Sequence, residues 1–192
     1  MRDGFIRTAA ATPKIKVADP VHNRETICRI IEEYEKKGAE LLVFPELCLS
    51  GYTCNDLFQQ EILLEQVKEE LKNLVDFTKG RKMLLFAGLP WEHEGKLYNV
   101  AAAICDGELL GLVTKTNMPN YSEFYELRHF TPGMEIPVLT DWLDTQVPMG
   151  TNLLFTCKEN PKLTVAAEIC EDVWVPCPPS IRHALAGATV IV

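Results

Sequence analysis

The sequence lacks any long apolar run and any excess of basic residues. No hydrophobic stretch approaches the roughly 20 residues that span a bilayer, and no basic segment followed by a hydrophobic one opens the chain. We therefore expect neither a membrane span nor a secretory signal, and we place the protein in the cytoplasm. Lys and Arg number 19 against 27 Asp and Glu, a net charge of -8. This balance argues against a nucleic-acid-binding surface and against docking on an anionic membrane.

The cysteines and histidines show neither a disulfide framework nor a metal-binding pattern. The seven cysteines include no Cys-x-x-Cys pair, and the four histidines are scattered along the chain. An odd number of cysteines without a secretory signal predicts reduced thiols. Because the spacings match no zinc motif, we expect no bound metal.

The chain does contain enough apolar sequence for one substantial core. It has 192 residues, of which 47% are hydrophobic and 24% charged, a composition typical of a globular protein. We expect one domain over residues 1–192. With no basic surface, the expected binding partner is a small molecule.

Apolar runs alternate with helical patterns through the first half of the chain. Runs typical of strands cover residues 5–11, 40–44 and 83–88, and a helical pattern separates the first two, which predicts a parallel βαβ unit. A second helix is expected over about residues 56–79. Its inward-facing residues are expected to be Ile62, Leu63, Val67, Leu71, Leu74 and Val75.

The second half of the chain predicts further strands. Residues 97–105 and 109–116, joined at Asp106-Gly107, predict a hairpin, so the sheet is mixed. Residues 141–152 are expected to be irregular. Short strands are expected at 153–157, 163–167 and 188–192, with a short helix before the last one. Because that last strand has barely begun at Val192, we expect either a fragment or a sheet edge that something else covers.

Cys170 follows the apolar run 163–167 and lies among three carboxyl groups. Ligands of open α/β sheets bind at the carboxyl ends of strands, so this thiol is a candidate nucleophile. The alternative is an inert buried cysteine. Glu46 and Lys115 also come at the ends of apolar runs. We expect the three side chains to meet at matching strand ends.

A cysteine nucleophile needs a group that takes its proton, since the pKa of a free thiol is near 8.5. His183 is the only histidine nearby in the sequence, and a Cys-His pair is one alternative. A desolvated glutamate is the other, because burial raises the pKa of a carboxyl group towards that of a thiol. A nearby ammonium would stabilise both the thiolate and a developing oxyanion. Glu46 and Lys115 would supply these two groups.

Three motifs resemble, in the same order, those of the nitrilase (carbon-nitrogen hydrolase) superfamily. They are Phe44-Pro45-Glu46-Leu47, Lys115 followed by Met118-Pro119-Asn120-Tyr121, and Glu168-Ile169-Cys170-Glu171-Asp172. Three longer stretches, at residues 49–53, 119–126 and 171–176, are similar to the glutaminase domains of glutamine-dependent NAD(+) synthetases. The resemblance runs across essentially the whole chain.

The resemblance implies an α/β fold, an αββα sandwich with a mixed central sheet that is incomplete at the C-terminus. It also implies that Cys170 attacks the side-chain amide of L-glutamine, which forms a glutamyl thioester and releases ammonia. Glu46 would act as general base and acid. Lys115 and the backbone N–H of Glu171 would hold the oxyanion.

The same resemblance assigns the substrate-binding residues. Tyr121 and Glu171 would hold the α-amino and carboxylate end of glutamine, Tyr52 would line the pocket, and Glu126 would orient the lysine. The alternatives are packed aromatic side chains and solvated or helix-capping acids. Trp174 is expected to be a core residue.

Other parts of the implied enzyme are expected outside this chain. The glutaminase domain would need no cofactor, whereas a following synthetase domain would bind ATP and Mg²⁺. No Ser-Gly-Gly-type pyrophosphate loop is present. The full-length protein would be a homo-oligomer, and a segment after Val190 would complete the glutamine pocket.

Two other functions stay open at this point. One is a stand-alone amidase of the superfamily, of the ω-amidase or carbamoylase type. The other is a catalytically silent module that keeps the fold for assembly.

Overall fold

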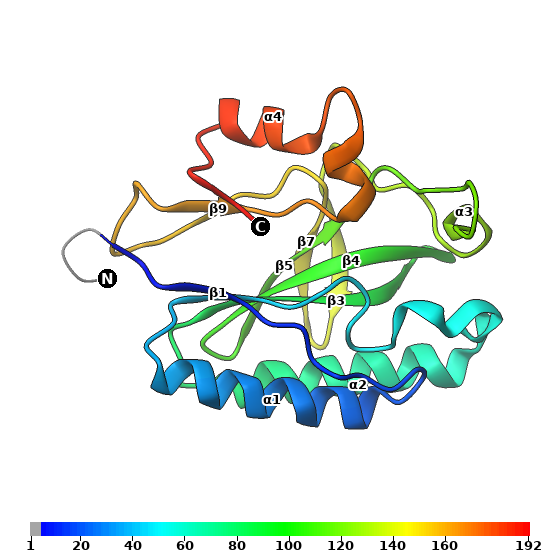
Figure 1. The fold of residues 1–192 in the computed structure, drawn as a ribbon, viewed down its shortest axis with the longest axis horizontal. Coiled ribbons are helices and arrows are strands. Elements are labelled where there is room, and N and C mark those ends of the chain that lie inside the picture. The colour runs from blue at the N-terminus through cyan, green and yellow to red at the C-terminus, as the bar shows by residue number, and fades with distance from the viewer. Residues whose placement is uncertain (1–4) are drawn as a thin grey trace.

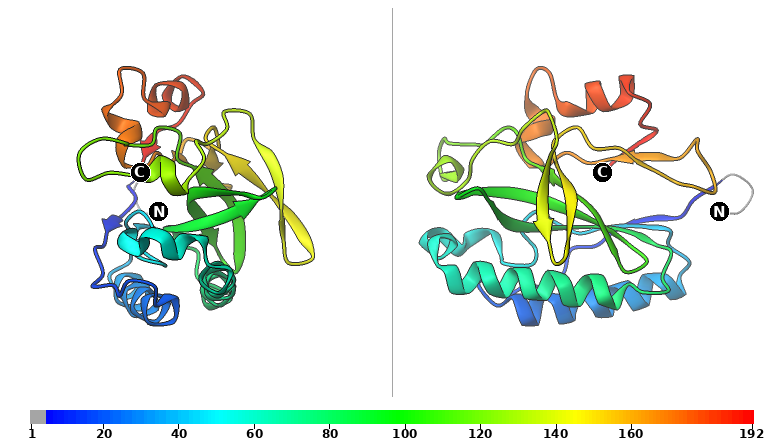
Figure 2. Two further views of the ribbon diagram at one scale, coloured as in Figure 1. Left: turned by 90° about the vertical axis from the view of Figure 1, so that its right-hand side faces the viewer. Right: turned by 180° about the vertical axis from the view of Figure 1, so that it is seen from behind.

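The computed structural model describes residues 5–192, which form four layers. Helices α1 (Pro20–Lys36) and α2 (Glu61–Phe77) lie on one face of a seven-stranded sheet (Figure 1). A three-stranded sheet lies on the other face, and α4 (Pro179–Leu185) covers it, as the two further views in Figure 2 show. This layer order confirms the αββα sandwich.

The large sheet has the strand order β1-β2-β3-β4-β5-β7-β6 and is mixed. The first three strands pair in parallel, which confirms the predicted βαβ unit, and β4 runs antiparallel to both β3 and β5, which confirms the predicted hairpin. The strands are β1 (Thr8–Ala10), β2 (Leu41–Val43), β3 (Leu84–His93), β4 (Lys96–Cys105), β5 (Glu108–Thr114), β6 (Val138–Trp142) and β7 (Thr145–Gly150).

The small sheet has the order β10-β9-β8. Its central strand β9 pairs in parallel with β10 and antiparallel with β8. The strands are β8 (Phe155–Thr156), β9 (Thr164–Ala166) and β10 (Val190–Ile191). The short strands predicted within residues 153–157, 163–167 and 188–192 are therefore confirmed.

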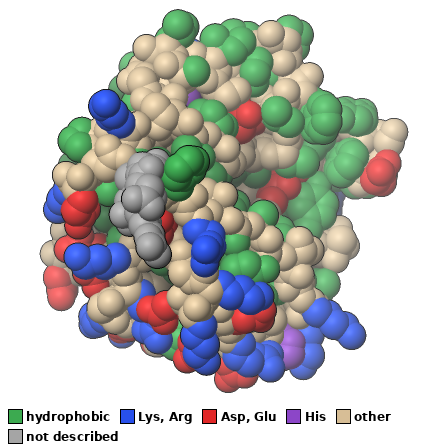
Figure 3. All heavy atoms as spheres, turned by 60° about the vertical axis from the view of Figure 1, so that its left-hand side comes forward, with side chains coloured by type: hydrophobic (Ala, Val, Ile, Leu, Met, Phe, Trp, Pro, Cys, Tyr) green, Lys and Arg blue, Asp and Glu red, His purple; other side chains and the backbone are tan. Residues whose placement is uncertain are grey.

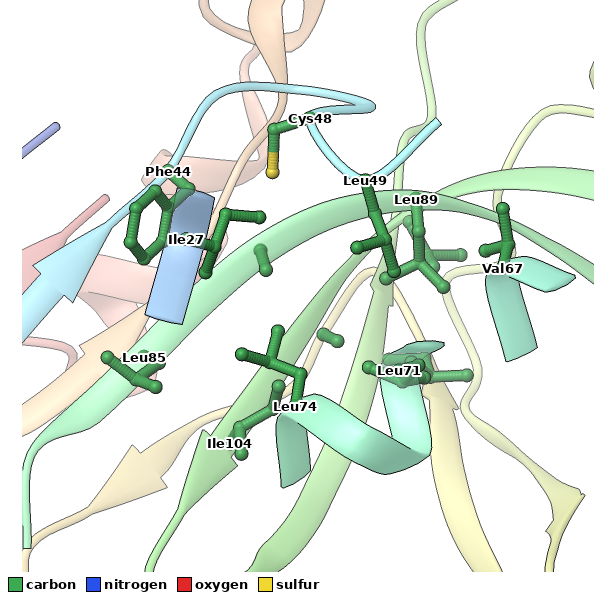
Figure 4. Packing of buried hydrophobic residues seen from close by; sticks show 14 of the residues in the cluster. Ile27, Phe44, Cys48, Leu49, Val67, Leu71, Leu74, Leu85, Leu89 and Ile104 are labelled. Atoms are coloured by element: carbon green, nitrogen blue, oxygen red, sulfur yellow. The ribbon is translucent and has the colours of Figure 1, made fainter. Parts of the chain in front are cut away.

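The large sheet is buried on both faces, which explains why its strands are apolar throughout. Successive side chains of a strand point to opposite faces. Leu85 accordingly packs with the helix side chains, whereas Phe86 packs with residues of the small sheet. Leu112 and Val113 divide in the same way. Figure 4 shows the helix-side cluster, in which Leu74 of α2 lies close to residues of β3 and β4.

Helix α1 begins and faces the sheet as its sequence predicts. The carboxylate of Asp19 accepts a hydrogen bond from the backbone N–H of His22 at 3.0 Å, and Pro20 occupies the first turn. Ile27 and Ile31 are fully buried against the sheet. Charged side chains gather over this helical layer in the lower part of Figure 3.

The expected helix over residues 56–79 is wrong in its first part. A 3₁₀ segment, η1 (Tyr52–Gln59), comes first, and Asn55 has a φ of 49° inside it. Gln60 is extended, so α2 begins only at Glu61. This start places Leu63, Val67 and Leu71 on the buried face at helical spacing. Ile62 therefore points outward and is 73% exposed, contrary to expectation.

Residues 141–152 are not irregular, because most of them belong to the hairpin of β6 and β7. The sequence did not predict this hairpin because Thr, Gln, Pro and Gly make up most of β7, and such a composition is not typical of a strand. Pairing with β5 on its other side fixes β7 in the sheet. Among residues 5–192, no helix is both long enough and apolar enough to cross a membrane.

Leu74→Ala is expected to lower the free energy of unfolding by about 2–5 kcal/mol, because it leaves a cavity in a fully buried position. Ile62→Ala on the same helix is the matched control and should change it by no more than about 0.5 kcal/mol. Urea unfolding of both variants measures the difference. Equal losses would contradict the assigned helix face.

Candidate active site

Lys115 follows β5 directly and is 0% exposed. Its Nζ lies 2.7 Å from Oε1 of Glu46, and 2.7 and 2.8 Å from the two carboxylate oxygens of Glu126. Burial lowers the pKa of the ammonium, but the charges and hydrogen bonds of the two carboxylates outweigh burial and leave the pKa above its ordinary value. Lys115 is therefore a buried cation held between two acids.

Glu46 lies in a turn that follows β2 and rests directly on β3. The backbone N–H of Leu49 donates to the carbonyl of Gly88 at 3.0 Å. A Cβ on Gly88 would come 2.3 Å from the backbone nitrogen of Leu47, so only glycine permits this approach. Asn99 on β4 adds a second contact, since its Nδ2 lies 2.5 Å from Oε1 of Glu46.

Glu126 is buried, contrary to the alternative of a solvated acid. It begins the short helix α3 (Glu126–His129), and Tyr52 donates its hydroxyl hydrogen to Oε1 of Glu126 at 2.8 Å. Burial raises the pKa of Glu126, and the hydrogen bond from Lys115 offsets only part of this rise. Burial and the neighbouring Glu126 also raise the pKa of Tyr52. A continuous chain of contacts thus links Tyr52, Glu126, Lys115 and Glu46.

Cys170 is exposed to solvent, so the alternative of an inert buried thiol is wrong. It is the first residue of the 3₁₀ helix η2 (Cys170–Trp174) and has a φ of 48°, a left-handed conformation that is strained for a residue with a Cβ. Partial burial nevertheless raises the thiol pKa, and the charge and hydrogen bonding of Glu46 raise it further, whereas Lys115 lowers it. In the resting site the balance favours the protonated thiol.

The three side chains meet across two sheets rather than at the ends of one. Glu46 and Lys115 follow β2 and β5 of the large sheet, whereas Cys170 follows β9 of the small sheet. The three residues thus follow strand ends, as expected, but the strands belong to two different sheets. Glu46 and Cys170 line one cavity of about 100 Å³, which apolar residues of both sheets complete.

Asp172 joins the segment after β5 to the segment after β9, a role that was not predicted from the sequence. Its buried carboxylate accepts hydrogen bonds from the backbone of Thr116 at 3.2 Å, of Asn117 at 2.8 Å and of Ile169 at 3.2 Å, and from the side-chain amide of Asn117 at 2.9 Å. The bonds fix the residues beside Lys115 against those beside Cys170. Its position two residues after the thiol was the only available signal.

Tyr121 and Glu171 form a separate pair at the surface. The hydroxyl of Tyr121 lies 3.0 and 3.2 Å from the two carboxylate oxygens of Glu171, and the tyrosine is 57% exposed. The hydrogen bond to Glu171 raises the pKa of Tyr121, and the charge of Cys170 contributes to the shift. Glu171 directly follows Cys170 in η2, so the pair lies beside the thiol.

Trp174 and His183 do not take the places that were considered for them from the sequence. Trp174 is 78% exposed rather than in the core, because η2 carries it away from both sheets. His183 is buried with its Nε2 3.1 Å from the carbonyl oxygen of Thr151, and its Nδ1 has no hydrogen-bond partner in the described structure. Neither ring nitrogen contacts Cys170, so the Cys-His alternative is wrong.

Comparison with known proteins gives the family. The model of the family described as carbon-nitrogen hydrolase matches residues 7–192. The chain belongs to the carbon-nitrogen hydrolase family. The superfamily resemblance and the expectation of an enzyme are therefore confirmed. Within residues 5–192, no group of three His, Cys, Asp or Glu side chains could hold a metal ion, and all seven cysteines are free thiols.

Three similar proteins extend this comparison. The glutamine-dependent NAD(+) synthetase of Mycobacterium bovis is 40% identical over 188 residues, which are 98% of this chain and 28% of that protein. A crystal structure of a glutamine-dependent NAD(+) synthetase from Cytophaga hutchinsonii has a TM-score of 0.85 and 28% identity, and the match covers 97% of this chain and 30% of that one. An amidase from Nesterenkonia sp. has a TM-score of 0.72 and 22% identity, with 100% and 65% covered. This chain thus spans about 28% of the length of such a curated relative.

The pH dependence of thiol alkylation is expected to report the charges around Cys170. The rate with iodoacetamide should rise with an inflection above the ordinary thiol pKa of 9.0, because burial and the nearby carboxylates favour the protonated form. Glu46→Gln should move the inflection to lower pH, since it removes a negative charge and leaves the ammonium of Lys115. Cys170→Ala gives the background from the other thiols. An inflection that rises in Glu46→Gln would contradict the arrangement.

Proposed function

We propose that this domain hydrolyses the side-chain amide of glutamine to glutamate and ammonia. The observation that carries the proposal is the ammonium of Lys115, which is buried between Glu46 and Glu126, together with the thiol of Cys170 in the cavity that Glu46 also lines. A nucleophile, a proton carrier and a fixed cation are the groups that amide cleavage through a thioester requires.

The first step forms the thioester. As Sγ of Cys170 attacks the amide carbon, its proton passes to Glu46, and the carbonyl oxygen becomes an oxyanion. Lys115 and the backbone N–H of Glu171 would stabilise that charge. The carbon–nitrogen bond then breaks, and Glu46 gives the proton to the leaving nitrogen, so that ammonia departs. The resting thiol is protonated, which fits a proton transfer that accompanies attack.

The second step releases glutamate. Glu46 takes a proton from a water molecule while the oxygen of that water attacks the thioester carbon. When the carbon–sulfur bond breaks, the sulfur leaves as a thiolate, and Glu46 returns the proton to it. The sum of both steps consumes one glutamine and one water and yields one glutamate and one ammonia.

The remaining site residues would bind and orient. The Glu171 carboxylate would attract the α-ammonium of glutamine, and the Tyr121 hydroxyl, which donates to Glu171 in this structure, would turn its hydrogen to the α-carboxylate. Tyr121 is exposed, and Glu171 directly follows Cys170 in the chain. Tyr52 would line the pocket, and Glu126 would hold the lysine ammonium in place.

In a longer protein, the ammonia would serve ATP-dependent amidation of deamido-NAD(+) by a synthetase domain. The support is the 40% identity to a glutamine-dependent NAD(+) synthetase of which this chain matches 28%. ATP and Mg²⁺ would bind in that domain, and the full protein would be a homo-oligomer. We place this chemistry in the cytoplasm, where seven free thiols would stay reduced.

A second candidate is an amidase that acts on simple amides without a synthetase. The fold likeness to the Nesterenkonia amidase, which covers 100% of this chain, favours it. Such an enzyme would not bind an α-amino acid, so it would not need the hydrogen-bonded pair of Tyr121 and Glu171.

Glutamate release from glutamine by the complete protein tests the proposal, with propionamide as the competing substrate. Cys170→Ala should abolish release, and Lys115→Met should lower kcat by about a hundredfold or more because the oxyanion loses a donor. Glu171→Gln should raise KM for glutamine and leave propionamide unaffected. Unchanged glutamate release in Cys170→Ala would overturn the proposal, and faster turnover of propionamide would favour the simple amidase.

A further inference from the structure

Asn99 touches both charged partners of the site and was not found by sequence analysis. It lies on β4 opposite Pro90 and is 0% exposed. Its side-chain Nδ2 lies 2.5 Å from Oε1 of Glu46, and its backbone carbonyl accepts the N–H of Lys115 at 2.9 Å. A single residue in the middle of the sheet thus sets the relative position of the acid and the cation.

The two donors converge on the same carboxylate oxygen. Oε1 of Glu46 accepts from Asn99 and also from Nζ of Lys115 at 2.7 Å. Hydrogen bonds to one oxygen fix the rotation of the carboxylate and concentrate its negative charge there. These two bonds occupy Oε1 and leave Oε2 as the oxygen available to receive a proton.

We propose that Asn99 is a positioning residue that holds Oε1 of Glu46, so that Oε2 exchanges the proton with Cys170, the amide nitrogen and water. The inference rests on the proposed amide hydrolysis and assigns the two carboxylate oxygens to different tasks.

The rest of the Asn99 side chain supports a functional role. Its Oδ1 is buried and has no hydrogen-bond partner among the described residues. The reverse orientation of the amide would place Oδ1 against the Glu46 carboxylate, where the two oxygens repel, so the side chain is held with its donor inward. A buried unsatisfied oxygen is unfavourable, and an apolar side chain would avoid it. The position therefore keeps an amide for its donor.

A neutral donor also suits a residue that must both take and return a proton. Lys115 already supplies one positive charge to Glu46 and Glu126 together. A second cation at position 99 would favour the carboxylate so strongly that it would return the proton poorly. An amide fixes the geometry without adding charge.

The test is the pH dependence of kcat for glutamate release by the complete protein carrying Asn99→Asp or Asn99→Leu. Both variants keep Lys115, Glu126, Cys170 and Tyr52, the groups that surround Glu46. We expect kcat to fall by about a hundredfold while KM changes little, because the substitutions impair proton transfer but leave the glutamine-binding residues in place. The acidic limb should move up by about one pH unit or more in Asn99→Asp, since the added carboxylate favours the protonated form of Glu46. The shift should be smaller in Asn99→Leu.

Asn152→Asp is the matched control. Asn152 also donates its amide, to the carbonyl of Glu135 at 2.9 Å, and also has a buried Oδ1 without a partner in the described structure. The same substitution there should leave the acidic limb unmoved. Circular dichroism checks that each variant is folded. If Asn99→Asp does not fold, Asn99→Leu takes its place in the test.

Folded Asn99 variants with an unmoved acidic limb would overturn the inference and leave Asn99 a structural residue. If the wild-type protein releases no glutamate, the proposed function fails, and iodoacetamide alkylation of Cys170 still tests the contact. In that experiment Asn99→Asp should shift the thiol inflection upward, because it adds a charge next to Glu46. An unchanged inflection would count against Asn99.

Discussion

The buried ammonium of Lys115 is the constraint on which the rest of the site depends. An isolated cation in an apolar interior is strongly unfavourable, so it must have partners that offset its lost hydration. Glu46 and Glu126 supply them, one from the turn after β2 and the other from α3. Burial raises the pKa of the Cys170 thiol, and the charges of the two acids, which one amine does not balance, add to this rise.

The fold places these groups by burying one sheet on both faces. Residues of one parity on its strands pack against α1 and α2, and residues of the other parity pack against the small sheet. The small sheet therefore brings Cys170 to the edge where β2 and β5 end. Asp172 then ties the two segments together through hydrogen bonds from the backbone N–H groups of Thr116 and Asn117 and from the side-chain amide of Asn117. Packing brings the sheets together, and this carboxylate fixes their register at the site.

The sequence predicted what depends on local pattern or motif. Strand periodicity gave the βαβ unit and the hairpin, and the motif resemblance found Glu46, Lys115 and Cys170. The sequence could not show that the strand before Cys170 belongs to a second sheet, because strands of two or three residues carry no pairing signal. Asn99 was missed for a similar reason. It stands inside an apolar strand, and only the three-dimensional approach to Glu46 distinguishes it from an ordinary buried amide.

The free energy of unfolding of Lys115→Met, alone and combined with Glu126→Gln, tests the central claim most directly. Removing the ammonium leaves the buried carboxylate of Glu126 and the partly buried one of Glu46 uncompensated, so the single variant should lose about 3–5 kcal/mol. Adding Glu126→Gln removes one of those charges and should restore part of the loss. If the double variant instead loses the sum of the two single effects, the ammonium does not hold the site together.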